Sequence, residues 1–575
     1  MTQHNDQRFG RRTLIKNAVA LAGGTVAGAL VESGCSTANG PTGPSGGPSI
    51  IASDSSVVAE TTSGRVRGYK RNGINGFRGV PYGATTAGEA RFLPCTKPKP
   101  WAGLRSSLYY GQVCPQAVRA TWANDELSFL SQWDDGQPGE DCLRVNVWTP
   151  GLNDNKKRPV MVWVHGGGYT GGSGQEHPAY NGENLSRRGD VVVVGFNHRL
   201  NIFGFLNLAE YGSKYADSGN VGMLDIVAVL EWVRDNIASF GGDPSNVTIF
   251  GQSGGGGKVS TLLAMPAAKG LFQRAVVQSG STLRQGTPEN AAKLAAAVLT
   301  ELNIDKSHID KIHTVPVAAL IDASAAAAKK INPAPPGALG GPFGGVRRGA
   351  PPRIGWGPIV DGKNLPAHPF DPAAPAVSAQ IPMMIGTVMN EFSPSMGYPE
   401  LESMSEDELK RRASERYADK AQSVIDACRR VYPNVKPVEV LSLVSSVRTN
   451  AVAQAERKAA LGTASAYLYL FCYHTPVLDG RPRAFHFSDV PYVFDNTDLS
   501  AFATGGTAEA RDLAARISDA WLHFARTGNP NHSGLPSWPA FTADRVPTMC
   551  FDKKCEVKND HDRDLRKAAA EALSL

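Results

Sequence analysis

The sequence predicts an α/β fold in which a mostly parallel central sheet is covered by helices on both faces. Three unbroken apolar or β-branched runs support this prediction, at residues 159–164, 191–195 and 247–250. Such runs are typical of strands that are buried on both faces. Residues 223–239 place apolar side chains at helical spacing between the second and third runs. Strand, helix and strand in this order favour a parallel sheet with helices on both sides.

A candidate nucleophile follows the third of these strands. Ser253 lies in Gly-Gln-Ser-Gly-Gly at 251–255, and a serine on a sharp turn between strand and helix is exposed for attack. Gly251 and Gly255 let the two backbones approach more closely than a Cβ would allow. The pattern alone is weak, because Ser45 also matches it in a Gly/Pro/Ser-rich stretch with no strand before it. Ser253 therefore needs a base, an acid and an oxyanion hole from elsewhere in the chain.

A candidate oxyanion hole follows the first strand. Residues 165–169 read His-Gly-Gly-Gly-Tyr. Consecutive glycines expose backbone N–H groups, which acyl transfer needs because negative charge builds on the carbonyl oxygen in the transition state. The predicted donors are the N–H groups of Gly167 and Gly168, together with Gly254 directly after the nucleophile. Taken alone, the three glycines form a plain turn equally well.

Further motifs extend along nearly the whole chain after the N-terminal segment. They include Phe-Arg-Gly-Val-Pro-Tyr at 77–82, Glu-Asp-Cys-Leu-Arg-Val-Asn-Val-Trp at 140–148, and segments at 91–92, 197–205, 232–244 and 524–530. In this number and order they resemble the type-B carboxylesterases, the α/β-hydrolase family that includes cholinesterases and several fungal lipases. The resemblance implies an α/β-hydrolase fold and a serine hydrolase that cleaves small-molecule carboxylic esters through an acyl-enzyme, without a cofactor.

The family's chain order of serine, acid and histidine implies the acid of a catalytic triad. Glu391 follows a predicted strand at 382–387 and matches the family's acid, although Phe392 stands where the family usually has glycine. Asp361 is the rival acid, and it matches an upstream Asp-Gly pair of the family that has a structural role.

The resemblance also implies the base. His486 lies in the segment 484–494, which matches the family's histidine loop. His165 belongs to the glycine turn, His198 to an Asn-His-Arg loop, and His474 follows a strand without the signature. The expected catalytic triad is therefore Ser253, Glu391 and His486.

The turn around Ser253 departs from the family's usual Gly-Glu-Ser-Ala-Gly-Gly. Gln252 replaces the glutamate and removes a negative charge beside the nucleophile, so a preference for cationic substrates is not expected. Gly254 replaces the alanine; it still offers its N–H group and makes the oxyanion hole more pliable.

The family resemblance implies a disulfide between Cys114 and Cys142. In cholinesterases the enclosed loop borders the active-site gorge, and here it contains Trp122 and Trp133. These tryptophans are as consistent with ordinary packing as with lining the acyl or alcohol pocket. Cys550 and Cys555 lie near enough in sequence to close a small loop.

The remaining cysteines of the mature chain predict no metal site. We expect buried free thiols at Cys95, Cys428 and Cys472. No Cys-x-x-Cys pair occurs in the sequence, so a zinc site has little support.

The N-terminus predicts export. Residues 1–38 resemble a twin-arginine signal peptide, with Arg11 and Arg12 before an apolar run at 17–31. We expect a periplasmic or secreted protein, with lipid attachment at Cys35 as the alternative and no other membrane contact.

The rest of the chain predicts a linker and one catalytic domain. Residues 39–55 read as a Gly/Pro/Ser-rich linker and 56–575 as a single domain. The Pro/Gly-rich segment 325–355 is either a surface insertion or a flap over the site.

Several other functions are disfavoured. The net charge of +6 includes no basic block, so nucleic acid is not an expected partner. The sequence does not fit a phosphate-binding loop ending at Lys258, because the first glycine of that motif would fall on Gln252 and its hydroxyl residue on Val259.

The alternatives that stay open are a lipase, an aryl or carbamate ester hydrolase, and a non-catalytic binding protein on this fold. The sequence leaves the oligomeric state open.

Overall fold

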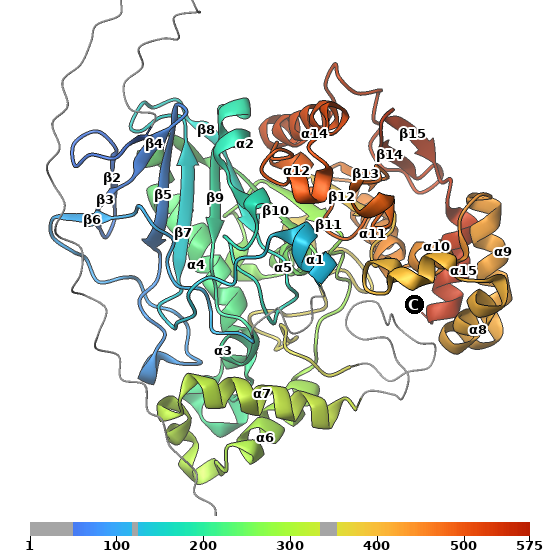
Figure 1. The fold of residues 1–575 in the computed structure, drawn as a ribbon. Coiled ribbons are helices and arrows are strands. Elements are labelled where there is room, and N and C mark those ends of the chain that lie inside the picture. The colour runs from blue at the N-terminus through green and yellow to red at the C-terminus, as the bar shows by residue number, and fades with distance from the viewer. Residues whose placement is uncertain (1–49, 118–124, 334–352, 575) are drawn as a thin grey trace, which may run out of the picture. The chain divides into compact units, whose positions relative to one another are not determined.

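The fold is built on one large sheet, seen in the computed structural model of the protein (Figure 1). The structure describes residues 50–117, 125–333 and 353–574. The large sheet has 12 strands. In spatial order they are β1 (Ile50–Ile51), β4 (Tyr69–Arg71), β5 (Ile74–Pro81), β7 (Arg144–Thr149), β9 (Val192–Phe196), β8 (Arg158–Val164), β10 (Gly242–Gln252), β11 (Arg274–Gln278), β12 (Met383–Val388), β13 (Ala466–Phe471), β14 (Pro547–Phe551) and β15 (Glu556–Asn559).

The centre of this sheet is parallel, as the sequence predicts. Every neighbouring pair from β9 through β8, β10, β11, β12 and β13 to β14 runs parallel. The predicted strands are confirmed, because β8, β9 and β10 match the three apolar runs singled out above and β12 matches the strand predicted at 382–387. The pairs at both edges are antiparallel. The carboxyl ends of the central strands therefore meet along one edge, where sites of α/β proteins lie.

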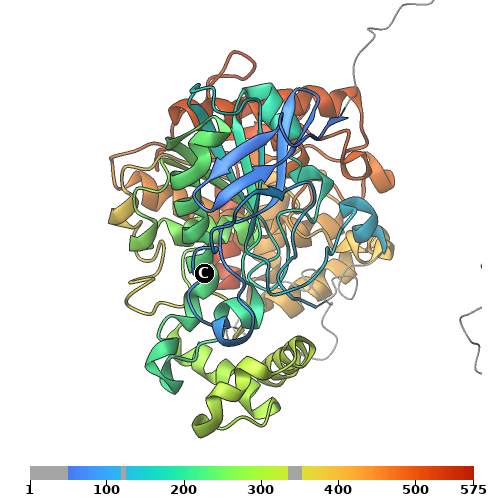
Figure 2. The same cartoon turned by 90° about the vertical axis from the view of Figure 1, so that its left-hand side faces the viewer.

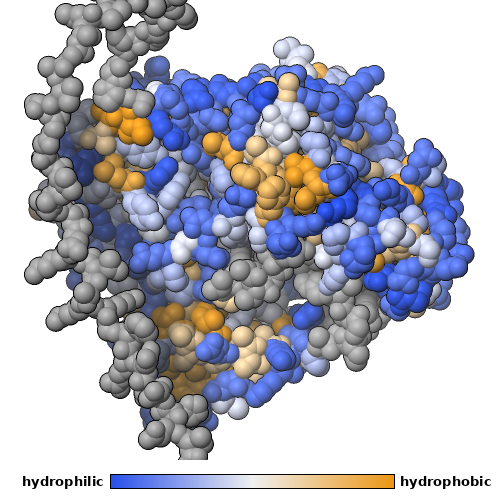
Figure 3. All heavy atoms as spheres, in the orientation of Figure 1, coloured by the Kyte–Doolittle hydropathy of each residue, from blue (hydrophilic) through white to orange (hydrophobic). Residues whose placement is uncertain are grey.

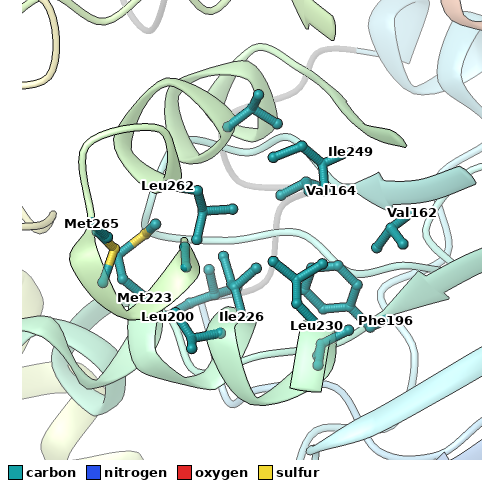
Figure 4. Close-up of a cluster of buried hydrophobic side chains, with 14 of the residues drawn as sticks. Val162, Val164, Phe196, Leu200, Met223, Ile226, Leu230, Ile249, Leu262 and Met265 are labelled. Carbon is teal, nitrogen blue, oxygen red and sulfur yellow. The ribbon is translucent and has the colours of Figure 1, made fainter. Parts of the chain in front are cut away.

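Helices cover both faces of the sheet because side chains alternate along each strand. On β8, Val162 and Val164 belong to a core cluster that also holds Leu230 and Leu262, from the helices α4 and α5 (Figure 4). The helix α4 (Val221–Asn236) confirms the helix predicted at 223–239, and α5 (Gly254–Leu262) begins directly after Ser253.

The opposite face of the sheet has its own core. Met161 and Trp163 alternate with the valines of β8 and pack in a second cluster with Trp521 of α14 (Ala508–Thr527). The two clusters bury the central strands on both faces. These strands therefore appear in the sequence as unbroken apolar runs.

The remaining elements lie around this core. Helices α8, α9, α10 and α15 share a separate buried cluster, and α6 and α7 lie apart from the sheet at one end (Figures 1 and 2). The other helices are α1 (Asp125–Ser131), α2 (Glu183–Gly189), α3 (Asn201–Phe205), α6 (Pro288–Glu301), α7 (Val317–Ile331), α8 (Glu406–Tyr417), α9 (Ala421–Val431), α10 (Pro437–Leu443), α11 (Ser446–Ala459), α12 (Val490–Val493), α13 (Ala501–Thr504) and α15 (Arg563–Leu573). A small sheet contains β2 (Val58–Thr61), β3 (Gly64–Arg67) and β6 (Leu104–Ser106).

Two expected boundaries differ from the structure. The expected linker 39–55 ends in a strand, since β1 (Ile50–Ile51) pairs with β4. The expected insertion 325–355 begins within α7, which continues to Ile331 because its alanine-rich run is a strong helix former. The signal peptide, residues 39–49 of the linker and residues 334–352 of the insertion lie outside the described residues.

The cysteines are neighbours in two places. Cys114 and Cys142 are buried and present as free thiols, and the hydrogen bond to Cys114 together with burial raises the pKa of Cys142. The implied disulfide between them stays a prediction. The thiol of Cys550 is hydrogen-bonded to Cys472 rather than paired with Cys555, because β13 and β14 are adjacent strands.

The surface that is visible in Figure 3 is mainly hydrophilic, with separate hydrophobic areas. Among the helices of the described ranges, none combines the length and hydropathy that crossing a membrane requires.

Candidate active site

The predicted site residues come together at one cavity near the carboxyl ends of β8 and β10. The cavity has a volume of about 470 Å³, within the range of small-molecule sites. Five of the six predicted catalytic and oxyanion residues line it, and they come from four separate parts of the chain: Gly167, Gly168, Ser253, Glu391 and His486. The sixth residue, Gly254, lies behind this lining and packs against Gly168.

Ser253 lies on a strained turn between β10 and α5. Its backbone has φ 56° and ψ −124°, a strained conformation that L-residues rarely adopt and that occurs mainly at functional sites. Its N–H group donates to the carbonyl oxygen of Gln278 at 2.8 Å, which ties the turn to β11. A Cβ on Gly255 would lie 1.9 Å from the carbonyl oxygen of Val164, and one on Gly251 would lie 2.6 Å from the same oxygen. Both glycines therefore permit the turn.

Buried Glu391 pairs with His486, which is partly exposed. The distance between Oε2 of Glu391 and Nδ1 of His486 is 2.5 Å, and the His486 N–H group donates to the carbonyl oxygen of Glu391 at 2.8 Å. The second oxygen of Glu391 accepts the N–H group of Val388 at 3.3 Å. Glu391 is 1% exposed, so little water competes for its carboxylate.

Asp361, the rival acid, lies in a different set of contacts. Its carboxylate accepts hydrogen bonds from the side chains of Asn220 and Asn364, each at 2.9 Å. It also accepts the backbone N–H groups of Lys363 and Leu365 at 3.0 Å. The structure therefore pairs His486 with Glu391 and gives Asp361 a role in holding its own loop.

The free edge of the imidazole is available to the nucleophile. Nε2 of His486 is buried and has no hydrogen-bond partner among the described residues, while Ser253 lines the same cavity. The ring of Phe392 lies 4.4 Å from the His486 ring at an interplanar angle of 33°. The residue that departs from the family pattern thus packs directly on the imidazole face.

The three predicted oxyanion donors lie in contact with one another. The backbone N–H groups of Gly167, Gly168 and Gly254 donate no hydrogen bond to another described residue. A Cβ added to Gly254 would lie 2.4 Å from N of Gly168 and 2.3 Å from its carbonyl oxygen. The two backbones therefore touch, and their unused donors suit an oxyanion.

Aromatic side chains build one wall of the cavity. The Trp133 ring lies 4.5 Å from His177, which in turn lies 5.1 Å from Phe487 and 5.1 Å from Tyr180. All four residues line the cavity, so Trp133 contributes to the pocket, while Trp122 lies outside the described residues. Sequence reasoning missed His177, Tyr180 and Phe487, although Phe487 directly follows the predicted base.

Gln252 lines the cavity where the family usually places a glutamate. The cavity still holds a second carboxylate besides Glu391, because Glu176 lines it as well. Glu176 is 2% exposed and accepts the N–H group of Ser173 at 2.9 Å.

A buried carboxylate lies behind the Glu391–His486 pair. One oxygen of Asp489 accepts hydrogen bonds from Gln278 and Tyr469, each at 2.9 Å. Burial above all, together with the nearby Glu391 charge, raises the pKa of Asp489 to about 6. Sequence reasoning assigned this residue no role, although it stands in the same segment, 484–494, as the base.

Asp489 predicts a dependence of stability on pH. Because its pKa is about 6 in the folded state, against an ordinary value of 3.8, the folded state binds more protons than the unfolded state between these pH values. The free energy of unfolding should fall by about 3 kcal/mol as the pH rises through this range, and this loss should persist above pH 6.

Asp489→Asn should remove this penalty, because the amide oxygen still accepts both hydrogen bonds and carries no charge. Urea unfolding at pH 4.5 and pH 8 measures the effect. We expect the variant to gain more stability relative to the native protein at pH 8 than at pH 4.5, and equal differences at both pH values would contradict this prediction.

Comparisons with known proteins show the family of the chain. The chain matches the carboxylesterase family over residues 54–568. It is 35% identical over 520 residues to the para-nitrobenzyl esterase of Bacillus subtilis (strain 168), covering 88% of this chain and 97% of that protein. It is 31% identical over 513 residues to the phenmedipham hydrolase of Pseudarthrobacter oxydans, with 88% and 97% covered.

A solved structure is similar over almost the same length. It belongs to an esterase from Clostridium hathewayi that can hydrolyse aliphatic aromatic polyesters, with a TM-score of 0.76 and 37% identity over 91% of this chain and 99% of that one. Since both the family match and this likeness extend over nearly the whole described fold, the chain belongs to the carboxylesterase family, has the α/β-hydrolase fold and is a carboxylic ester hydrolase.

Proposed function

We propose that the protein hydrolyses carboxylic esters through a covalent acyl-enzyme formed on Ser253. The observation that carries this proposal is the Glu391–His486 pair, in which the free Nε2 of His486 shares a cavity with a serine on a strained turn. A nucleophile beside a base that is itself oriented by a third group is the arrangement that acyl transfer requires.

The first half of the reaction forms the acyl-enzyme. As Oγ of Ser253 attacks the ester carbonyl carbon, its proton passes to Nε2 of His486. Glu391 holds the imidazole through Nδ1 and stabilises the imidazolium that results. The carbonyl oxygen becomes an oxyanion and accepts the N–H groups of Gly167, Gly168 and Gly254. When the carbon–oxygen bond breaks, His486 returns the proton to the departing alcohol.

The second half releases the acid. His486 takes a proton from a water molecule, which attacks the acyl carbon and forms a second oxyanion in the same hole. Collapse of this intermediate breaks the bond to Ser253, and His486 protonates Oγ. The ester and one water are thus converted to an acid and an alcohol.

A fluorophosphonate probe tests this proposal. It phosphonylates an activated serine and should label the native protein, while Ser253→Ala should stay unlabelled. Ser45→Ala, which removes the other serine in the same five-residue pattern, is the matched control and should label like the native protein. An unlabelled native protein, or equal labelling of Ser253→Ala, would contradict the proposal.

The aromatic wall favours esters that carry an aromatic ring. Offset or edge-on contacts with Trp133, Tyr180 and Phe487 would stabilise such a ring beyond simple burial. The names of two relatives, para-nitrobenzyl esterase and an esterase acting on aliphatic aromatic polyesters, support this substrate class.

Benzyl acetate and cyclohexylmethyl acetate test the preference, because their alcohols are similar in size and acidity. We expect kcat/KM to be about 2- to 10-fold higher for the benzyl ester, as aromatic contacts are worth roughly that factor. Trp133→Leu should remove the difference, whereas Trp101→Leu, outside the cavity lining, should keep it. Equal rates for the two esters in the native enzyme would exclude an aromatic preference. A p-nitrophenyl ester series of increasing acyl length then separates esterase from lipase.

A further inference from the structure

Lys258 is a buried lysine that the mechanism above does not use. It lies in α5, the helix that begins directly after Ser253, and its exposed fraction is 0%. Its ammonium group donates to the carbonyl oxygen of His165 at 3.1 Å and to that of Gly166 at 3.4 Å. It also lies 5.9 Å from the centre of the Tyr169 ring. A cation is thus packed against the glycine loop that carries two of the oxyanion donors.

A fully buried lysine is unusual. An ammonium is rarely buried completely, because burial costs free energy unless the group is hydrogen-bonded. The charge acts on its surroundings, because it adds to burial in lowering the pKa of the neighbouring His198. A residue that breaks local rules in this way is expected at a functional site.

The geometry of the peptide group links Lys258 to the oxyanion hole. The carbonyl group of Gly166 and the N–H group of Gly167 belong to one planar trans peptide, so they point in opposite directions. Lys258 contacts the Gly166 oxygen, as does Nδ1 of His165 at 3.1 Å, and the position of this oxygen fixes the direction of the Gly167 N–H group. Gly166, Gly167 and Ser253 all line the cavity. A cation at the carbonyl oxygen also polarises the amide and strengthens its N–H group as a donor.

We propose that Lys258 is a positioning residue of the oxyanion hole, which orients and polarises the Gly166–Gly167 peptide toward the oxyanion of the transition state. This inference rests on the proposed function and adds a residue to it. Because the oxyanion exists only in the transition state and the tetrahedral intermediate, Lys258 raises kcat and leaves substrate binding unchanged.

Lys258→Met, which keeps the length of the side chain without its charge or donors, tests the proposal. We expect kcat per active site, titrated with a fluorophosphonate, to fall roughly 10- to 100-fold, less than or comparable to losing one donor. KM should stay within about 2-fold. A trifluoromethyl ketone, which forms a hemiketal oxyanion on Ser253, should bind more weakly by the same factor. Lys258→Gln keeps a neutral hydrogen-bond donor, and its kcat should lie between those of the native enzyme and Lys258→Met. This second variant keeps the test decisive if the methionine variant folds poorly.

Lys458 offers a matched control. It is also buried, and its ammonium group donates to the carbonyl oxygens of Ser378 at 3.0 Å and Ala379 at 2.7 Å, outside the cavity lining. Lys458→Met should lower the melting temperature while kcat per active site and inhibitor affinity stay native.

Three results would overturn the proposal for Lys258. They are an unchanged kcat per active site in both Lys258 variants, a loss confined to KM, and a loss of inhibitor affinity no greater than in Lys458→Met. With a hydrolytically active native enzyme, each of these leaves the proposed function standing, whereas an inactive native enzyme overturns both.

Discussion

Glu391→Gln is expected to lower kcat by about 10⁴-fold, the loss seen when a triad acid becomes an amide. The carboxylate lies 2.5 Å from Nδ1 of His486 and is 1% exposed. An amide in its place carries no charge to stabilise the imidazolium and allows the wrong tautomer, in which Nε2 carries the proton. Steady-state hydrolysis of a p-nitrophenyl ester measures the loss, which should fall on kcat rather than on KM.

Asp361→Asn is the matched control, because Asp361 is the other candidate acid. Its partners are two asparagines and two backbone N–H groups of its own loop, so the substitution should lower stability and leave kcat within a few-fold of native. If Asp361→Asn lost as much activity as Glu391→Gln, the assignment of Glu391 would be wrong.

Gly254→Ala is expected to lower kcat by about 10²-fold, the cost of losing one oxyanion donor. Although the family usually has alanine here, a Cβ in this chain would lie 2.4 Å from both N and Cα of Gly168. Backbone atoms cannot approach a Cβ so closely, so the Gly168 segment must move and take its N–H group with it. The measurement is kcat per titrated active site, together with the affinity for a trifluoromethyl ketone.

Gly195→Ala is the control for this prediction. Gly195 lies in β9, and a Cβ there would meet its nearest atoms at 3.5 and 3.8 Å, which is ordinary contact. We expect this variant to keep native kcat. A Gly254→Ala enzyme with native activity would show that the two backbones separate without cost, and the pliable hole expected from the sequence would then be correct.

Local patterns in the sequence predicted the central sheet and the candidate nucleophile. The apolar runs at β8, β9 and β10 identify strands buried on both faces, since such strands carry no polar alternation. Ser253 follows one of these strands, whereas Glu391 and His486 were implied by the resemblance to a family. The structure brings all three residues to one cavity.

The features that the sequence left open depend on contacts between distant segments. His177 joins the aromatic wall only because its loop packs against Trp133 and Phe487. Burial raises the pKa of Asp489, and its hydrogen-bond partners Gln278 and Tyr469 come from the distant strands β11 and β13. No spacing rule predicts such contacts.

The contacts of Lys258 and of the cysteines also could not be predicted from sequence spacing. The sequence around Lys258 suggested a phosphate loop that then failed, whereas its contacts with the carbonyl oxygens of His165 and Gly166 required the fold. Likewise, Cys550 lies nearer to Cys555 in sequence but contacts Cys472 in space, because strand order decides which thiols meet.

The central claim is that ester hydrolysis passes through an acyl group on Ser253. Rapid mixing with a p-nitrophenyl ester, acid quenching and mass spectrometry of the digested protein test it most directly. We predict that the peptide containing Ser253 gains the mass of the acyl group during turnover, with no such gain in Ser253→Ala. An acyl group on a different residue, or turnover that persists in Ser253→Ala at the native rate, would contradict the account.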